Sequence, residues 1–277
     1  MHRGVGLIVA AAIAAATMLS VTTPAAAIEG GVPVATTEQN YRTFGALGRV
    51  VTTYADGRWG LCTATLIAPT VAMTAQHCMP FKNDRWDEGK SPSEIDIEVA
   101  FNVLDLDDGR GVLRKVVAGT ESNRDYGTEN DSIFLLHLDR PVTEVTPIRA
   151  AGHQEGDLWR KGRPVFALGW GYTEEGRESR ELRRADTTVR DTVATTAWKI
   201  GGALRVNDSG EGVTAPGDSG GPLITLDGAD RPVVVGVLWG GGVPWGRSTE
   251  RSYYMKPGVD SLFGDRGELV PNPRQVR

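Results

Sequence analysis

Residues 62–75 read CTATLIAPTVAMTA, and they contain two short apolar runs on either side of the turn residues Pro69 and Thr70. The runs, Cys62–Ile67 and Val71–Ala75, include Val, Leu, Ile and Thr and are too short to form helices of ordinary length. This stretch therefore predicts two β-strands joined by a tight turn.

The same pattern recurs along the chain. Further apolar runs of this kind are Phe44–Val51, Ile95–Val103, Gly111–Val117, Ile133–Leu138, Val165–Leu168 and Val233–Trp239. The pairs Asp56-Gly57 and Asp108-Gly109 lie between such runs and are typical of hairpin turns. Many short strands at this spacing predict an all-β barrel or sandwich. The one short helix that we expect is near the end of the chain, at Val259–Phe263.

Two polar segments interrupt the apolar runs. The strongly charged segment Thr173–Arg184 is predicted to be a solvated loop. Asp105–Gly109 has a faint similarity to a calcium-binding loop, but its glycine comes one place early and Val116 stands where the closing acid belongs. We expect a hairpin tip there.

The composition is that of a globular protein. The chain has 277 residues, of which 40% are hydrophobic and 23% are charged, so the chain is long enough and apolar enough to bury a large core. The 35 glycines favour a turn-rich β fold. The formal net charge of −5 excludes the broad basic surface that nucleic-acid-binding proteins carry.

The first 27 residues have the pattern of a secretory signal. A short basic start is followed by an apolar run over residues 5–19 and by the small residues Ala25-Ala26-Ala27. We expect cleavage after Ala27 and an exported mature protein. An uncleaved membrane anchor is the alternative, although the apolar run is short for a membrane span.

Cys62 and Cys78 are the two cysteines of the chain. An exported protein meets an oxidising environment, so an even pair predicts one disulfide, with two free thiols as the alternative. Two such ligands alone are too few for a zinc site.

His77 and Ser219 are the residues best placed for chemistry. His77 follows the apolar run Val71–Ala75 and adjoins Cys78, so a disulfide at Cys78 would fix its backbone, as a general base requires, and a structural role for His77 is the alternative. Ser219 lies within Pro216-Gly-Asp-Ser-Gly-Gly-Pro222. The glycines allow a tight turn that exposes the hydroxyl and lets successive N–H groups converge on one point.

Several motifs together resemble the chymotrypsin-like and trypsin-like serine proteases, and the sequence has the look of a secreted, bacterial member. In chain order they are Ile28-Glu-Gly-Gly31, Cys62–Pro69 with Thr74–Cys78, Gly169-Trp170-Gly171 followed by Ser179 and Leu182, Gly217–Pro222, and Leu238-Trp239-Gly240. The resemblance covers residues 28 to about 240.

The resemblance implies a particular fold. It has two antiparallel six-stranded Greek-key β-barrels with a short C-terminal helix. The barrels are expected over residues 28–150 and 151–262, forming one protease unit, and residues 263–277 are expected to be a flexible tail.

The resemblance also implies a catalytic triad of His77, Asp131 and Ser219. Asp131 precedes the apolar run Ile133–Leu138 and lies between His77 and Ser219 in the family's order, whereas Asp125 is the fallback. Two departures from the family pattern bear on the triad. Gln76 replaces a small residue before the histidine, and Leu238 replaces a serine that supports the aspartate.

Other roles follow from the same resemblance. The N–H groups of Gly217 and Ser219 are expected to form the oxyanion hole. Val213, Leu238, Trp239 and Gly240 are the expected substrate-binding residues, and an aliphatic Val213 at the pocket floor predicts apolar side chains at the cleaved position. Ile28 is expected to become the mature N-terminus and to pair with Asp218.

The sequence thus predicts a secreted, extracellular serine endopeptidase acting on proteins or peptides as a monomer. We expect it to need no metal or cofactor and to bind neither nucleic acid nor, once the signal is removed, a membrane. A catalytically impaired homologue acting as a binding protein and an esterase are the alternatives.

Overall fold

The computed structural model describes residue 28 and residues 30–79, 81–82, 85–86, 95–122, 133–152, 154–173, 175–195, 200–206, 214–241 and 252–255. The elements of the first half are β1 (Val32–Pro33), α1 (Glu38–Phe44), β2 (Leu47–Tyr54), β3 (Trp59–Ala68), β4 (Val71–Ala75), the 3-10 turn η1 (Gln76–Cys78), β5 (Phe81–Lys82), β6 (Arg85–Trp86), β7 (Ile95–Phe101), β8 (Val112–Ser122) and β9 (Ile133–Leu138). Those of the second half are the 3-10 turn η4 (Gly156–Trp159), β10 (Pro164–Gly169), β11 (Arg183–Thr195), β12 (Ile200–Val206), β13 (Pro222–Leu226), β14 (Pro232–Gly241) and β15 (Ser252–Met255).

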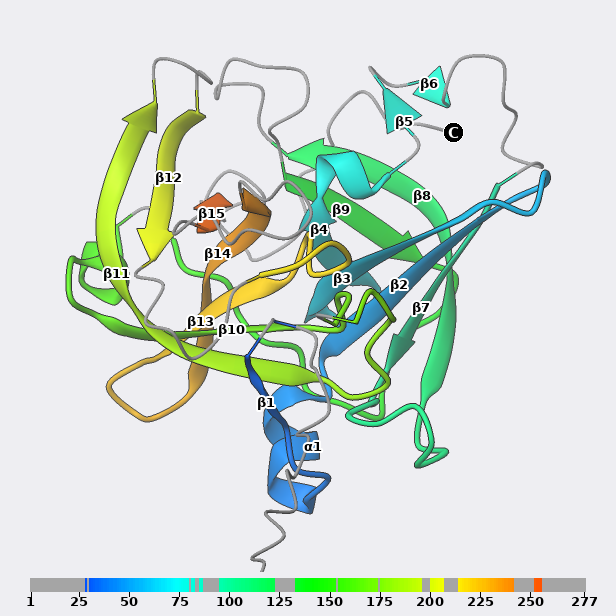
Figure 1. Ribbon diagram of the computed structural model, residues 1–277, viewed down its shortest axis with the longest axis horizontal. Helices are drawn as coiled ribbons and strands as arrows, with labels where there is room; N and C mark the ends of the chain where they lie inside the picture. Colours follow the sequence, from blue (N-terminus) through cyan, green and yellow to red (C-terminus); the bar gives the residue numbers. More distant parts are fainter. Residues whose placement is uncertain are drawn as a thin grey trace, which may run out of the picture.

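The first half is a closed antiparallel barrel with the strand order β2-β3-β4-β9-β8-β7 (Figure 1). Strand β7 shows why these strands form a barrel. Ile95, Ile97, Val99 and Phe101 are buried, while Asp96 is exposed, because successive side chains in a strand point to opposite faces. Asp56-Gly57 forms the β2–β3 turn and Asp108-Gly109 lies in the β7–β8 connection, as predicted.

The second half is a sheet with the order β1-β11-β10-β13-β14-β15-β12, in which β12 also pairs with β11. The β11–β12 pairing closes the strands β11-β10-β13-β14-β15-β12 into a circuit. Strand β1 pairs with β11 outside this circuit. The predicted all-β architecture is confirmed.

Among the described residues the one α-helix is α1, which was not predicted from the sequence. Its seven residues are too few for a clear helical period, but its start is well defined, since the Thr37 hydroxyl accepts a 3.2 Å hydrogen bond from the Asn40 N–H. Tyr41 and Phe44 are its buried residues, and the Phe44 ring meets the Phe166 ring of β10 edge-on. The helix expected at Val259–Phe263 lies outside the described residues. Within the described part of the chain, no helix is long and apolar enough to cross a membrane.

The buried apolar residues described form two core clusters, of which the larger spans both halves and the smaller is made up mainly of residues from the second half. The larger buried cluster contains the interior of the first barrel and also Leu168, Trp170, Leu182 and Ile224 from the second half. Backbone bonds reinforce this junction, since the Leu182 N–H donates to the Leu104 carbonyl at 2.8 Å. Residues at the boundary of the two halves are therefore held rigidly on both sides.

The prediction of a solvated loop over Thr173–Arg184 is wrong for the C-terminal part of that segment. Ser179, Leu182 and Arg183 are buried, and Arg183 already belongs to β11. The segment is drawn into the junction because its backbone pairs with the first barrel, and the Arg183 guanidinium donates a 2.8 Å hydrogen bond to the Gly31 carbonyl. Burial lowers the pKa of Arg183 from its ordinary value.

Candidate active site

His77 lies where a fully buried strand ends at the surface. All five residues of β4 are buried, and the chain then enters η1, in which Gln76 is buried and His77 is exposed. The predicted disulfide between Cys62 of β3 and Cys78 is confirmed, so η1 is tied covalently to the barrel directly after the histidine. The imidazole is therefore presented at the surface from a restrained backbone.

Ser219 lies in a tight turn that closes before β13. Gly217 has φ of 92°, a conformation that side-chain-bearing residues rarely adopt. The Asp218 N–H donates to the Ala215 carbonyl at 3.1 Å, and the Gly221 N–H donates to the Asp218 carbonyl at 2.8 Å. The turn is thus fixed by its own backbone bonds.

The N–H group of Asp218 has an acceptor, whereas the N–H groups of its two chain neighbours do not. Among the described residues, the N–H groups of Gly217 and Ser219 have no hydrogen-bond acceptor in the protein. Backbone donors without acceptors are uncommon in folded proteins, and neighbouring ones form a site for an anionic oxygen. These are the two donors expected from the sequence to form an oxyanion hole.

The Asp218 carboxylate is buried and fully engaged. One oxygen accepts the Gly171 N–H at 2.7 Å and the other accepts the Ala215 N–H at 2.8 Å, and the side chain is only 1% exposed. A Cβ atom added at Gly169 or Gly171 would lie 2.1 Å or 2.6 Å, respectively, from an atom of this carboxylate. The Gly-Trp-Gly motif thus leaves the space that Asp218 occupies.

Two buried threonines of the first barrel anchor the Ser219 turn, and neither was predicted from the sequence to have this role. The Thr63 N–H donates to the Ser219 carbonyl at 2.8 Å, and the Thr63 hydroxyl donates to the Gly217 carbonyl at 3.3 Å. The Thr74 hydroxyl in turn donates to the Thr63 carbonyl at 2.8 Å. Their polar side chains in otherwise apolar, buried strands are the sequence signal that could have indicated them.

The structure brings the His77 and Ser219 segments together from opposite halves of the molecule. The Cys78 sulfur lies 3.5 Å from the Ser219 carbonyl oxygen, next to the bond from Thr63. Ser219 Oγ makes no hydrogen bond to the His77 ring among the described residues, and such bonds are often long before substrate binds. Asp131, its fallback Asp125 and the expected pocket residue Val213 lie outside the described residues.

The strand expected to line the substrate cleft, β14, lies beside the Ser219 turn. The Gly220 N–H donates to the Leu238 carbonyl and the Leu238 N–H donates to the Gly221 carbonyl, both at 2.8 Å. The Leu238 side chain is only 3% exposed and packs in the smaller core cluster, whereas Trp239 and Gly240 are half-buried. Leu238 therefore contacts the turn through its backbone.

Ile28 lies in the second half of the molecule. Its side chain is 1% exposed within the smaller core cluster, and its carbonyl accepts the Gly31 N–H. In the full-length sequence Ala27 precedes it, so its nitrogen is a peptide N–H.

Tyr172 adjoins the same turn. Its N–H donates to the Pro216 carbonyl at 2.7 Å, and burial, helped by the nearby Glu178 carboxylate, raises the pKa of its phenol.

Comparison with known proteins agrees with this geometry. The family model described as Trypsin matches residues 30–259. The chain belongs to the trypsin family. Relatives of this trypsin-family chain include the Suppressor of tumorigenicity 14 protein homolog of Bos taurus, 31% identical over 76% of the chain and 24% of the relative. Fibrinolytic enzyme, isozyme C, of Lumbricus rubellus is 28% identical over 66% of the chain and 77% of its own length.

Granzyme M of Homo sapiens is 26% identical over 59% of the chain and 63% of its own length. The chain thus spans about a quarter of the bovine relative, and these three relatives come from animals, which gives no support to the bacterial origin expected from the sequence. Among solved structures, the scabies mite inactivated protease paralogue S-I1 has the same fold, with a TM-score of 0.58 and 17% identity over 84% of this chain and 95% of that one.

Proposed function

We propose that this trypsin-family chain is a serine endopeptidase that hydrolyses peptide bonds in proteins through an acyl-enzyme. The observation that supports this most directly is the pair of N–H groups of Gly217 and Ser219, which have no acceptor among the described residues although the N–H groups of Asp218, Gly220 and Gly221 in the same turn all have one. Buried backbone N–H groups usually have an acceptor in the protein. Where two neighbouring ones have none, a ligand oxygen can serve as their acceptor.

Each member of the triad has a defined role in the proposed reaction. Ser219 Oγ attacks the scissile carbonyl while His77 takes its proton, and the oxyanion that forms accepts the N–H groups of Gly217 and Ser219. His77 then gives the proton to the leaving amine. In the second half of the reaction His77 takes a proton from the water that attacks the acyl-enzyme, and it returns this proton to Ser219 Oγ as the acid product leaves. Asp131 orients His77 and stabilises its cation. No metal or cofactor takes part in these steps.

The restrained position of both catalytic segments supports the proposed chemistry. Disulfide Cys62–Cys78 fixes the end of η1, and Thr63 fixes the carbonyl of Ser219. A base and a nucleophile held from two rigid barrels need little further ordering when substrate binds, which lowers the entropic part of the barrier.

A fluorophosphonate probe tests the proposed nucleophile. The purified protein is expected to be labelled at Ser219, as identified by peptide mass spectrometry, and to hydrolyse peptides in a library. Labelling without peptide hydrolysis would favour the esterase alternative, and absence of both would favour the binding-protein alternative, for which Gln76 and Leu238 are the supporting residues.

The same library tests the proposed specificity. With Val213 at the floor of the primary pocket, cleavage is expected after apolar side chains, because an aliphatic floor cannot compensate the charge of a bound Lys or Arg. A strong preference for cleavage after Lys or Arg would show that Val213 is not at the floor.

Secretion and activation form the last part of the proposal. Removal of residues 1–27 would export the protein, and it would also convert the Ile28 nitrogen into an ammonium group able to pair with Asp218. The burial of Ile28 and of Asp218 supports this pairing. N-terminal sequencing of secreted active protein is expected to begin at Ile28, and a variant with one additional residue before Ile28 is expected to lose activity.

A further inference from the structure

Several cations in the second half of the molecule make no ion pair within the described part of the chain. Among the arginines and lysines whose side chains the structure describes, Arg160, Lys161, Arg163 and Arg190 make no ion pair with a described carboxylate, and Arg42 is the one other such cation. We call these four residues the basic patch. Apart from Arg42, the arginines elsewhere whose side chains are described have carboxylate partners, so the concentration of unpaired cations is a feature of this one place.

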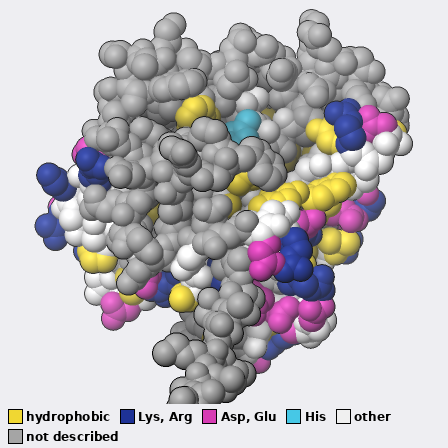
Figure 2. Space-filling view, viewed as in Figure 1, with side chains coloured by type: hydrophobic (Ala, Val, Ile, Leu, Met, Phe, Trp, Pro, Cys, Tyr) yellow, Lys and Arg dark blue, Asp and Glu magenta, His cyan; other side chains and the backbone are white. Residues whose placement is uncertain are grey.

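The backbone holds the four residues together. The Gly162 N–H donates to the Val189 carbonyl at 2.7 Å, and the Val189 N–H donates to the Arg163 carbonyl at 2.9 Å. These two bonds extend the β10–β11 pairing and set the turn at residues 160–163 beside Arg190. Figure 2 shows Lys and Arg side chains at the left-hand edge of the molecule, where Figure 1 places the turn before β10 and the middle of β11.

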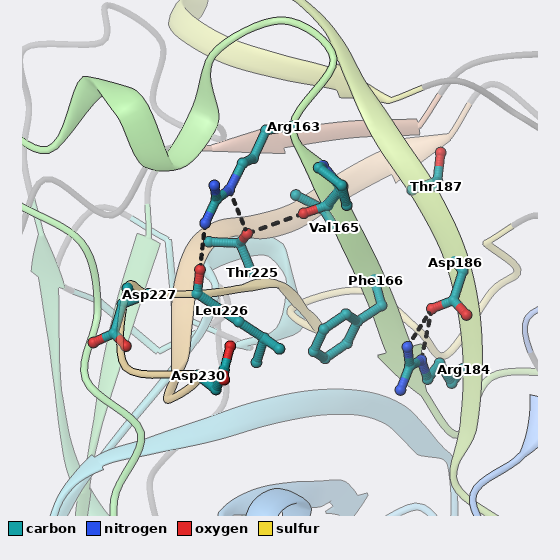
Figure 3. A pocket seen from close by; sticks show the side chains of 12 residues that line it. Arg163, Val165, Phe166, Arg184, Asp186, Thr187, Thr225, Leu226, Asp227 and Asp230 are labelled. Carbon is teal, nitrogen blue, oxygen red and sulfur yellow. Dashed lines mark hydrogen bonds and ion pairs between the residues drawn. The ribbon is translucent and has the colours of Figure 1, made fainter.

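Arg163 connects the basic patch to a surface groove of about 620 Å³. Its guanidinium donates to the Thr225 hydroxyl at 3.1 Å and to the Leu226 carbonyl, and the Leu226 side chain lines the groove and is 38% exposed (Figure 3). Further along the groove, Arg184 stacks on Phe166 and pairs with Asp186. The groove therefore offers an apolar wall directly beside the patch.

The carboxylates near the patch do not neutralise it. Asp227 lines the groove, but Arg149 and Arg231 pair with it, and hydrogen bonds from the N–H groups of Ala229 and Arg231 lower its pKa to about 2. Asp186 is paired with Arg184, and Asp230 is exposed on the groove wall. Two further carboxylates, Asp157 and Asp191, lie close to the patch in sequence. Their two negative charges are fewer than the four positive charges of the patch, so the local net charge remains positive.

We propose that the basic patch and the adjoining Leu226 wall bind an acidic segment of the enzyme's protein substrate, with glutamates or aspartates on the patch and an apolar side chain against Leu226. This inference rests on the proposed endopeptidase function. Arginine forks suit carboxylates because they bind them through two parallel hydrogen bonds. Such a site outside the catalytic centre raises the local concentration of a tethered scissile bond.

The surroundings favour a peptide over other polyanions. Nucleic-acid strands are held by exposed aromatic side chains on which bases stack, whereas Trp159, the aromatic residue next to the patch in sequence, is partly buried against the smaller core cluster. Anionic membranes are bound by basic surfaces with broad apolar faces, whereas the patch adjoins a single exposed leucine. A sulfated polysaccharide gains nothing from that leucine, but a peptide side chain does.

Binding is measured first with Ser219→Ala in the full chain, so that the result does not depend on catalysis. A fluorescein-labelled peptide with alternating Glu and Leu is titrated at low salt and followed by anisotropy. The triple variant Arg160→Ala, Lys161→Ala, Arg190→Ala is expected to bind about tenfold more weakly, and added salt is expected to weaken the parent. Arg163 is left in place because it also supports Thr225.

Arg42→Ala is the matched control, since Arg42 is exposed on α1 and has no described ion pair. Unchanged binding by this control is expected. Equal binding by the triple variant and the parent would overturn the proposal, as would an equal loss in Arg42→Ala. Tighter binding of a single-stranded oligonucleotide, of heparin or of phosphatidylglycerol vesicles than of the peptide would also overturn it.

Catalysis provides a second readout with Ser219 intact. Substrates carry a Glu-rich segment on either side of the scissile bond, joined by Gly-Ser linkers of graded length. The triple variant is expected to lose about tenfold in kcat/KM on the best of these and to match the parent on a short neutral peptide. If the parent hydrolyses nothing, the proposed function fails while the binding assay still decides the inference.

Discussion

The N–H of Thr63 in the first barrel donates a 2.8 Å hydrogen bond to the carbonyl of Ser219, so the proposed nucleophile is held by a strand of the opposite half of the molecule. The Thr63 hydroxyl adds a bond to Gly217, two residues earlier. The backbone on which the nucleophile sits is therefore positioned relative to the segment that carries His77.

Replacing Ser219 or His77 with alanine is expected to reduce peptide hydrolysis by at least about a thousandfold. The double variant is expected to be no worse than either single variant, because the two groups act in one proton transfer. His137→Gln is the control, since His137 lies on β9 and bonds to Thr120, and it is expected to keep activity. Substantial hydrolysis by Ser219→Ala would refute the assignment.

Thr74→Val is expected to lower both stability and kcat. Valine has the same shape but cannot donate to the buried Thr63 carbonyl, so the free energy of unfolding should fall by about 1 kcal/mol. Thr74→Ser retains the hydroxyl and is the matched control. Denaturant unfolding and steady-state kinetics check both effects, and equal behaviour of the two variants would show that the hydroxyl is unimportant.

Gly171→Ala is expected to destabilise the protein by about 1–3 kcal/mol and to impair catalysis strongly. The new Cβ would lie 2.6 Å from the Asp218 side chain, which has no room to move because both its oxygens are bonded. Gly228→Ala is the control, since a Cβ there meets nothing within 4 Å. Thermal unfolding and activity of the two variants are compared, and similar losses in both would argue against crowding of Asp218.

Removing the disulfide by Cys62→Ala with Cys78→Ala is expected to cost on the order of 3 kcal/mol, because the bridge spans 16 residues and restricts the unfolded chain. Activity should fall as well, since Cys78 adjoins His77. Reductant is expected to lower the Tm of the parent and to leave that of the double variant unchanged. If the Tm of the parent were the same with and without reductant, although the reductant was present during unfolding, the bridge would be contradicted.

Stability should fall as the pH decreases below about 6.5 because of His137. Burial lowers the pKa of this half-buried imidazole, so the unfolded chain takes up a proton at a higher pH than the folded chain does. The contribution of His137 is therefore fully present above pH 6.5 and is lost as the pH falls toward the lowered pKa. In His137→Gln this part of the pH dependence should be absent, as urea unfolding between pH 5 and 8 would show.

The strands were predictable where apolar residues formed continuous or alternating runs. Val71–Ala75 and Ile133–Leu138 coincide with β4 and β9 because both strands are buried over almost their whole length. The helix α1 was not predictable, since its stability comes from Tyr41 and Phe44 packing on residues distant in sequence. The end of the charged segment was misjudged for the same reason, because the burial of Arg183 depends on Gly31.

The candidate site shows the same division. His77, Ser219 and the disulfide followed from local motifs, and the structure places the two segments in contact. Thr63 and Thr74 could not be assigned a role from sequence, because their partners lie on other strands or in the other half of the chain. The basic patch was equally hidden, since an arginine lacking a partner looks in sequence like any other arginine.

The bond from Thr63 to Ser219 also joins two segments that leave the ribosome at very different times. The strands of the first barrel are complete once β9 has left the ribosome, long before the nucleophile turn is translated. The turn itself then needs Leu238 of β14, which is made later still. The Ser219 turn therefore has all of its backbone partners, from Thr63 of β3 on one side to Leu238 of β14 on the other, only after β14 has been made.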